Sequence, residues 1–147
     1  MKTHPDPLVG TTVLIVEDDV ELLRTLARRF HLAGSLVTPA KDGDEALARF
    51  KQSTPAVVVT DILMPNREGL ETIMEMKERS PQVKVLAISG GGLLGAGDVL
   101  DLAGRLGADA VLAKPFRSDQ VLEAVRKLIE GAENRDRPLE AGSQERA

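Results

Sequence analysis

The stretch Ala56-Val-Val-Val-Thr-Asp-Ile-Leu-Met-Pro65 decides the fold. An apolar, β-branched run leads to one carboxylate, Asp61, and more apolar residues follow it. Such a short continuous run is typical of a strand that is buried on both faces of a parallel sheet. We therefore expect Asp61 to lie where a buried strand ends, which is the edge at which α/β sheets carry their chemistry.

Two other predicted strands also end in charged residues. The run Thr12–Val16 is followed by Glu17-Asp18-Asp19, and the run 109–113 is followed by Lys114-Pro115. Because the carboxyl ends of parallel strands meet at one edge of the sheet, we expect these carboxylates and this ammonium to lie near Asp61.

Short β-branched runs alternate along the chain with segments of helical periodicity, which indicates βα units on a parallel sheet. The predicted class is α/β with a (βα)5 order. The strands are predicted over 12–16, 35–38, 56–60, 83–88 and 109–113. The helices are predicted after the acidic cluster at 17–19, from the Asp42-Gly-Asp-Glu45 cap, over 69–79, over 97–106, and from Ser118.

Length and composition predict a single domain over residues 11–130 of the 147-residue chain. We expect residues 1–10 to be flexible and the polar, aperiodic residues 131–147 to be a disordered tail. No effector domain is expected after residue 130, so a second domain would come from another chain.

The charge pattern argues against nucleic-acid binding, because the net charge is −4 and the basic residues form no stripe. The chain has no cysteine, which excludes disulfides and thiolate metal sites and fits a reducing compartment. The sequence shows neither a signal peptide nor a membrane-spanning stretch. We therefore expect a soluble, cytoplasmic protein that does not bind membranes.

Carboxylates that converge at one edge repel one another unless a cation lies between them. Mg²⁺, a hard ion that prefers oxygen ligands and takes phosphate oxygens well, satisfies this requirement and indicates phosphoryl chemistry. Lys114 would neutralise a phosphoryl oxygen, and Ser89, at the end of the strand 83–88, would donate a hydrogen bond to another.

Each of these residues also has an ordinary structural interpretation. Asp18 and Asp19 suit the positive end of a helix dipole, and a Lys-Pro pair is usually a turn. Their joint occurrence at four strand ends favours a site. The glycines of Gly90-Gly-Gly-Leu-Leu-Gly95 match a dinucleotide fingerprint, but the following strand ends in Lys114 where that motif needs an acid.

Several ordered motifs resemble the receiver domain of bacterial two-component response regulators over residues 11–130. These motifs are Leu14-Ile-Val-Glu-Asp-Asp19, Asp42-Gly43 with Glu45-Ala-Leu47, Val59-Thr-Asp-Ile-Leu-Met-Pro65, Ala87-Ile-Ser89 and Lys114-Pro-Phe116. The resemblance implies a flavodoxin-like fold with helices on both faces of the sheet. It also implies the strand order 2-1-3-4-5, which the chemotaxis member of this family has.

The resemblance also implies residue roles. Asp61 would accept a phosphoryl group from a sensor histidine kinase or a phosphotransfer protein. Glu17, Asp18, Asp61 and the carbonyl of Leu63 would hold Mg²⁺, whereas Asp19 would start the helix. Lys114, before a cis proline, would pair with the phosphoryl group. The target protein, which the sequence does not identify, would read the change on the face of helix 97–106, strand 109–113 and the last helix.

Two features depart from the family pattern. Val111 replaces the aromatic residue that usually lies in the fifth strand and reports the movement of the Ser/Thr. The loop 90–97 is unusually rich in glycine, and we hypothesise that this loop moves instead.

The predicted function is therefore a phosphorylation-dependent switch rather than an enzyme, with only slow self-phosphorylation from small donors and slow self-dephosphorylation. Adaptor, phosphorelay intermediate and phosphate sink stay open, as does homodimer formation. The alternative is a Mg²⁺-dependent aspartyl-phosphate phosphohydrolase. The haloacid-dehalogenase type of that class needs Asp-x-Asp, whereas Asp61 is followed by Ile62 and Leu63.

Overall fold

A single parallel sheet organises the protein. Within the residues that the computed structural model describes, 5–62, 68–89, 105 and 107–136, five parallel strands form this sheet in the order β2-β1-β3-β4-β5. The strands are β1 (Thr12–Val16), β2 (Leu36–Ala40), β3 (Val57–Asp61), β4 (Lys84–Ser89) and β5 (Ala110–Ala113). The predicted α/β class and strand order are confirmed.

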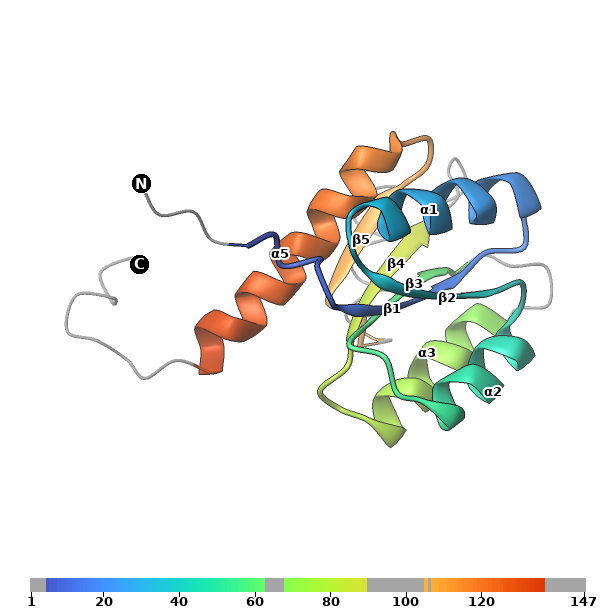
Figure 1. Cartoon of the computed structure of the whole chain (residues 1–147). Coiled ribbons are helices and arrows are strands. Elements are labelled where there is room, and N and C mark those ends of the chain that lie inside the picture. The colour runs from blue at the N-terminus through green and yellow to red at the C-terminus, as the bar shows by residue number, and fades with distance from the viewer. Residues whose placement is uncertain (1–4, 63–67, 90–104, 106, 137–147) are drawn as a thin grey trace, which may run out of the picture.

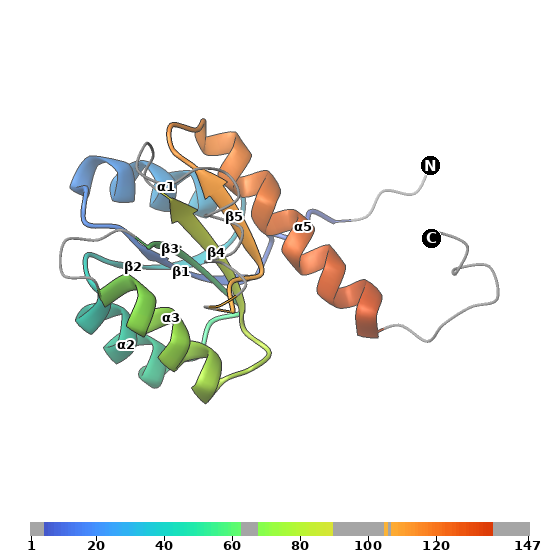
Figure 2. The ribbon, with the colours of Figure 1, turned by 180° about the vertical axis from the view of Figure 1, so that it is seen from behind.

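Helices cover both faces of the sheet (Figure 1). On one face lie α1 (Val20–Leu32) and α5 (Ser118–Asp136), and on the other lie α2 (Gly43–Gln52) and α3 (Glu68–Arg79); the view from behind shows the same two layers (Figure 2). Apart from Arg105, the helix predicted over 97–106 lies outside the described residues, as does the glycine-rich loop 90–97. Among the helices described, none combines the length and apolar character that crossing a bilayer requires.

The core consists of two layers, one on each face of the sheet. Alternate residues of each strand belong to one layer or to the other. Val13 and Ile15 of β1 pack with α1 and α5, whereas Leu14 and Val16 pack with α2 and α3. All five residues of β3 are buried, which is the reason for its continuous apolar run. The central position of β3 brings its last residue, Asp61, to the middle of the carboxyl edge.

The second strand extends further than the predicted range 35–38. It continues through Pro39 to Ala40. Leu36 donates its N–H to the Thr11 carbonyl and Ala40 accepts from the Glu17 N–H, so these residues turn their backbone toward β1. Pro39 therefore faces the free side of this edge strand, where its missing N–H removes no ladder bond.

Residues 6–10, which belong to the N-terminus predicted to be flexible over 1–10, pack against the domain. Leu8 is 0% exposed and belongs to the core beside α1 and α5. The Asp6 carboxylate accepts two hydrogen bonds from the Arg126 guanidinium of α5, at 3.0 and 2.9 Å. The Leu8 carbonyl accepts a third from the Ser35 hydroxyl at 2.8 Å. Packing and hydrogen bonding together therefore fix this segment against the domain.

The C-terminal boundary also differs from the prediction of disorder from residue 131. The last helix, α5, continues to Asp136. Gly131 is a weak helix former but does not end the helix, because a glycine inside a helix costs only about 1 kcal/mol relative to alanine. Residues 137–147 lie outside the described part of the chain.

Candidate functional site

Asp61 lies at the carboxyl end of β3 and is paired in register with Ile88 of β4. The residue is 4% exposed, so its carboxylate is almost shielded from water. Its Oδ2 atom accepts a hydrogen bond from the Nζ of Lys114 at 2.9 Å. The two residues are 53 positions apart in the sequence, and the parallel sheet brings them together.

Lys114 follows β5 directly. Its backbone N–H donates to the carbonyl of Ser89 at 2.9 Å, which attaches the lysine to the end of β4. The Lys114–Pro115 peptide bond is cis, as the family resemblance implied. The side chain is 28% exposed and reaches two carboxylates, those of Asp61 and Glu17.

Glu17 follows β1 and is buried, with 1% of its surface exposed. Its Oε2 atom accepts the backbone N–H of Asp19 at 3.0 Å. Its Oε1 atom lies 3.4 Å from the Lys114 Nζ as an ion pair, but it accepts no hydrogen bond. A buried polar atom without a hydrogen bond lowers stability by about 1–3 kcal/mol, so this oxygen suits a ligand that the protein itself does not provide.

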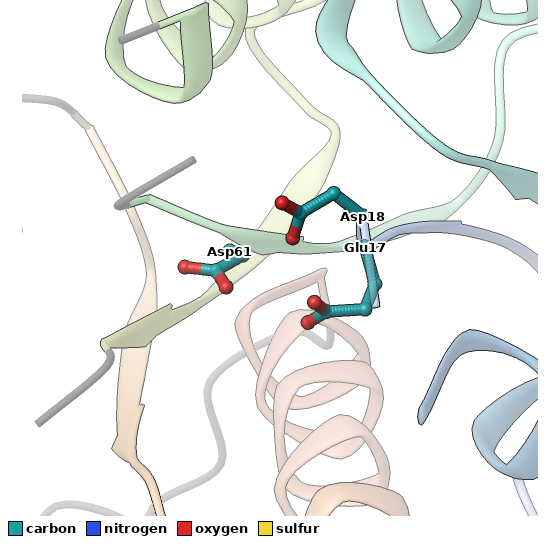
Figure 3. Close-up of side chains that lie close together, drawn as sticks. All are labelled: Glu17, Asp18 and Asp61. Carbon is teal, nitrogen blue, oxygen red and sulfur yellow. The ribbon is translucent and has the colours of Figure 1, made fainter. Parts of the chain in front are cut away.

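Three carboxylates converge beside this ammonium. One oxygen each from Glu17, Asp18 and Asp61 lies within 4.8 Å of the others, and the three side chains lie close together (Figure 3). Glu17 and Asp61 are buried whereas Asp18 is exposed, so the group opens to solvent on the side of Asp18. Asp19 is not part of the group. Its side chain accepts the N–H groups of Glu21 and Leu22 and caps α1, as predicted.

The electrostatics of the site follow from burial and from the shared ammonium. Burial raises the pKa of Glu17, while the Asp19 N–H and the Lys114 charge act in the opposite direction. Burial also acts to lower the pKa of Lys114, but the hydrogen bond and charge of Asp61, helped by Glu17, raise it above its ordinary value. Lys114 is therefore a cation at neutral pH.

The donor set fits a hard divalent cation. All three converging groups offer carboxylate oxygens, which are the ligands that Mg²⁺ prefers, and one of these oxygens is buried without a hydrogen bond. One ammonium cannot balance three carboxylates, so a further positive charge at this position would relieve their repulsion. The fourth predicted ligand, the Leu63 carbonyl, lies outside the described residues.

Ser89 lies at the same edge. It is the last residue of β4, is 2% exposed and is paired in register with Ala113, the residue before Lys114. The structure therefore brings the strand ends that carry Glu17, Asp61, Ser89 and Lys114 to one edge of the sheet.

One contact between two helices was not predicted from the sequence. The Arg29 guanidinium of α1 donates to the Ser118 hydroxyl at 2.6 Å and joins α1 to the first residue of α5, shortly after Lys114. The two residues are 89 positions apart, and neither belongs to a motif, so the sequence contained no signal for their contact.

Comparisons with known proteins agree with this geometry. The family model described as the response regulator receiver domain matches residues 13–126. The chain is 34% identical over 116 residues to the chemotaxis protein CheY of Listeria monocytogenes, covering 78% of this chain and 95% of CheY. It is 33% identical over 126 residues to the probable transcriptional regulator ycf27 of Cyanophora paradoxa, covering 83% of this chain but only 49% of that regulator.

Solved structures show the same architecture. A CheY-like receiver domain protein from Methanospirillum hungatei superposes with a TM-score of 0.77 at 24% identity, covering 86% of this chain and 98% of that one. A receiver domain protein from Clostridium thermocellum gives a TM-score of 0.70 at 27% identity, covering 85% and 95%. The first of these shows likeness of fold alone, because its identity is low.

Proposed function

Because the chain belongs to the family of response regulator receiver domains, which are phosphorylation-dependent signalling switches, we propose that Asp61 is its phosphoacceptor. One observation carries this proposal. Asp61 is a buried carboxylate at the sheet edge, 2.9 Å from the Lys114 ammonium and beside two further carboxylates. A general acid–base pair would not need that surplus of negative charge, whereas a metal-assisted phosphoryl acceptor does.

In the proposed reaction, a carboxylate oxygen of Asp61 attacks the phosphorus of a phosphohistidine on a histidine kinase or a phosphotransfer protein. A bond forms between that oxygen and phosphorus, and the phosphorus–nitrogen bond breaks. The bonding electrons return to the imidazole nitrogen of the donor. The product is an aspartyl phosphate on this chain.

Lys114 has two successive roles in this proposal. Before transfer, it holds the Asp61 side chain in place through the hydrogen bond to Oδ2. After transfer, its ammonium pairs with a phosphoryl oxygen, because the carboxylate has lost its own charge. We propose that Ser89, on the neighbouring strand end, donates its hydroxyl to another phosphoryl oxygen.

We propose that Glu17, Asp18 and Asp61 hold Mg²⁺, with the Leu63 carbonyl as a further ligand. When bound, Mg²⁺ would neutralise the oxygens of the incoming phosphoryl group. Glu17 contributes its buried Oε1, and the exposed Asp18 leaves a side of the site open to the donor.

The output of the switch stays a proposal as well. We propose that a protein target recognises the phosphorylated state. The roles of adaptor, relay intermediate and phosphate sink would all use this site. A Mg²⁺-dependent phosphohydrolase of the Asp-x-Asp type is disfavoured because Leu63 stands at the position of the second acid. The chain spans about half the length of the first curated relatives that it matches, such as 49% of ycf27, so their whole activities are not carried over. The expected cytoplasmic location stays a prediction.

The test is the intact mass of the protein after incubation with acetyl phosphate and Mg²⁺. We expect one added phosphoryl group on the wild type and none on Asp61→Asn, which keeps the shape of the side chain but removes its charge. Asp44→Asn is the matched control, because Asp44 is an exposed carboxylate on α2 and is not one of the three converging carboxylates. Omission of Mg²⁺ should abolish the adduct.

A different pattern would contradict the proposal. Equal labelling of Asp61→Asn would place the acceptor elsewhere. No labelling of folded wild type, either by acetyl phosphate or by a panel of phosphorylated histidine phosphotransfer domains, would show that this site does not accept phosphoryl groups.

A further inference from the structure

A hollow lies at the edge of the sheet opposite Asp61. It has a volume of about 430 Å³, within the range of sites that hold ligands or peptide side chains. It lies between the starts of β1 and β2 and the last turns of α1 and α2. The lining consists of strand residues Thr12, Val13, Leu14, Leu36, Val37 and Thr38, of helix residues His31, Arg49 and Gln52, and of Ser35, Ser53 and Pro55.

This hollow includes part of a free strand edge. In the described residues β2 has β1 on one side and no strand on the other. Leu36 and Ala40 bond toward β1, so alternation turns the backbone N–H and C=O of Val37 outward. Pro39, the next outward residue, offers only a carbonyl. The edge can therefore pair with a short extended segment near Val37 but not with a long strand.

The ionised side chain in the lining of the hollow is basic. Arg49 carries this charge, His31 is the other basic residue, and none of the residues that line the hollow is a carboxylate. This contrasts with the net charge of −4 for the whole chain. Arg49 forms an ion pair with Glu45 at 3.7 Å, and both side chains are substantially exposed. Displacing this contact would therefore cost a partner less than about 1 kcal/mol of binding free energy.

The ends of two helices bring carbonyl groups here, which would oppose an anion. Several of those carbonyls are already satisfied. The Arg29 and Phe30 carbonyls accept the Ala33 N–H, and the Arg49 carbonyl accepts the Ser53 N–H. The basic side chains therefore determine the sign of the electrostatic potential that an approaching partner meets.

An apolar patch adjoins the hollow. Leu36, which lines it, is 61% exposed, and Leu32, at the end of α1, is 66% exposed. Val9 is 60% exposed, and its Cγ2 atom lies only 3.0 Å from the position that a Cβ on Gly34 would occupy, so it covers the turn between them. These three exposed aliphatic side chains lie on either side of the turn at Gly34, and exposed aliphatic side chains in such a group commonly mark contact sites.

We propose that this surface binds an extended segment of a partner protein that carries both carboxylate and aliphatic side chains. The outward N–H and C=O of Val37 would pair with the segment as in strand addition. Carboxylates of the segment would meet Arg49 on the α2 face of the sheet, and its aliphatic side chains would cover Leu32, at the end of α1, on the opposite face. A symmetric contact of this surface with the same surface of a second copy is disfavoured, because it would bring the same basic groups together. The surface acts independently of Asp61.

The test uses ¹⁵N-labelled full-length protein and the peptide acetyl-Glu-Val-Glu-Leu-Glu-amide, in which alternation places carboxylates on one side and aliphatic groups on the other. We expect saturable shifts of the Val37, Thr38 and Gln52 amide signals with a Kd of roughly 0.1–1 mM. Arg49→Glu should weaken binding at least about fivefold, because it reverses the charge of the hollow. Arg24→Glu makes the same change at an exposed site on α1 that does not line the hollow, and it should bind like the wild type.

Two more ligands complete the test. The Lys-Val-Lys-Leu-Lys counterpart should not bind, and methylation of the peptide nitrogens should weaken binding if the strand edge is used. The proposal is overturned if no saturable shift appears up to about 5 mM, if the shifts lie away from β2, or if Arg49→Glu binds like the wild type. It is also overturned if free succinate reproduces the shifts, since the hollow would then recognise a small anion rather than a chain.

Discussion

At the residue scale, Lys114 contacts two buried carboxylates and can neutralise only one. Its Nζ lies 2.9 Å from Asp61 and 3.4 Å from Glu17, and the latter contact is not a hydrogen bond. Asp18 adds a third negative charge at the open side. In the metal-free site, the carboxylates therefore repel one another. The burial of Glu17 raises the pKa of its carboxyl group, and a pH titration of stability detects this effect.

For Glu17 we predict a stability that falls as pH rises in metal-free buffer. Burial raises the folded-state pKa above the ordinary value of 4.5, so between these two pKa values the folded protein binds more protons than the unfolded chain. The stability that the proton contributes is complete below 4.5 and is lost as pH rises through the folded-state pKa. Glu17→Gln should flatten this dependence in urea unfolding followed by circular dichroism.

Glu21→Gln is the control, because Glu21 is an exposed acid on the first turn of α1. It should leave the slope of stability against pH unchanged. A wild type whose stability rises over the same pH range, or a Glu17→Gln variant with an undiminished slope, would contradict the assignment of this dependence to Glu17.

The convergence of these residues was predictable because each stands where an apolar run stops. Asp61 ends a strand, and Glu17 and Lys114 each follow one; the composition alone marks these strands, and parallel topology brings such ends together. The sequence could not show that Lys114 reaches both carboxylates, or that one Glu17 oxygen lacks a hydrogen bond. Those facts depend on side-chain geometry that no sequence spacing encodes.

At the scale of elements, the N-terminal segment shows where local pattern fails. Leu8 and Val9 are an isolated apolar pair between Asp6-Pro7 and Gly10, so they show neither the period of a helix nor that of a strand. The burial of Leu8 arises from distant partners, because Arg126 of α5 binds Asp6 and Ser35 binds the Leu8 carbonyl. The extent of β2 beyond residue 38 also depends on its place in the fold. Pro39 is tolerated because β2 is an edge strand, and the sequence alone does not specify that position.

We predict that Leu8→Ala lowers the free energy of unfolding by about 2–5 kcal/mol, as expected for a fully buried leucine. Val9→Ala is the matched control. Val9 is the next residue and is 60% exposed, so its change should stay within about 0.5 kcal/mol. The measurement is urea denaturation followed by far-ultraviolet circular dichroism, since the chain has no tryptophan or tyrosine. Equal effects of the two substitutions would mean that the segment is not part of the core.

At the scale of the whole molecule, the proposed metal ligands follow two different strands, and the lysine follows a third. Glu17 and Asp18 follow β1, Asp61 ends β3 and Lys114 follows β5. In the sheet order β3 lies between β1 and β4, and β5 is an edge strand. A ligand at this edge therefore contacts segments from both halves of the sequence. Because the unfolded chain cannot hold these groups together, the binding energy adds to the stability of the entire domain.

We therefore predict that Mg²⁺ raises the free energy of unfolding by about 2.7 kcal/mol when its concentration is 100 times its Kd. Asp18→Asn should lose most of this gain, because the substitution removes one of the three carboxylates. It should barely change metal-free stability, because Asp18 is exposed. The measurement is thermal unfolding over a Mg²⁺ series at constant ionic strength, which separates binding from screening. If Mg²⁺ stabilised the wild type and Asp18→Asn equally, the cation would be acting at another site or through general screening, and the three carboxylates would not be its ligands.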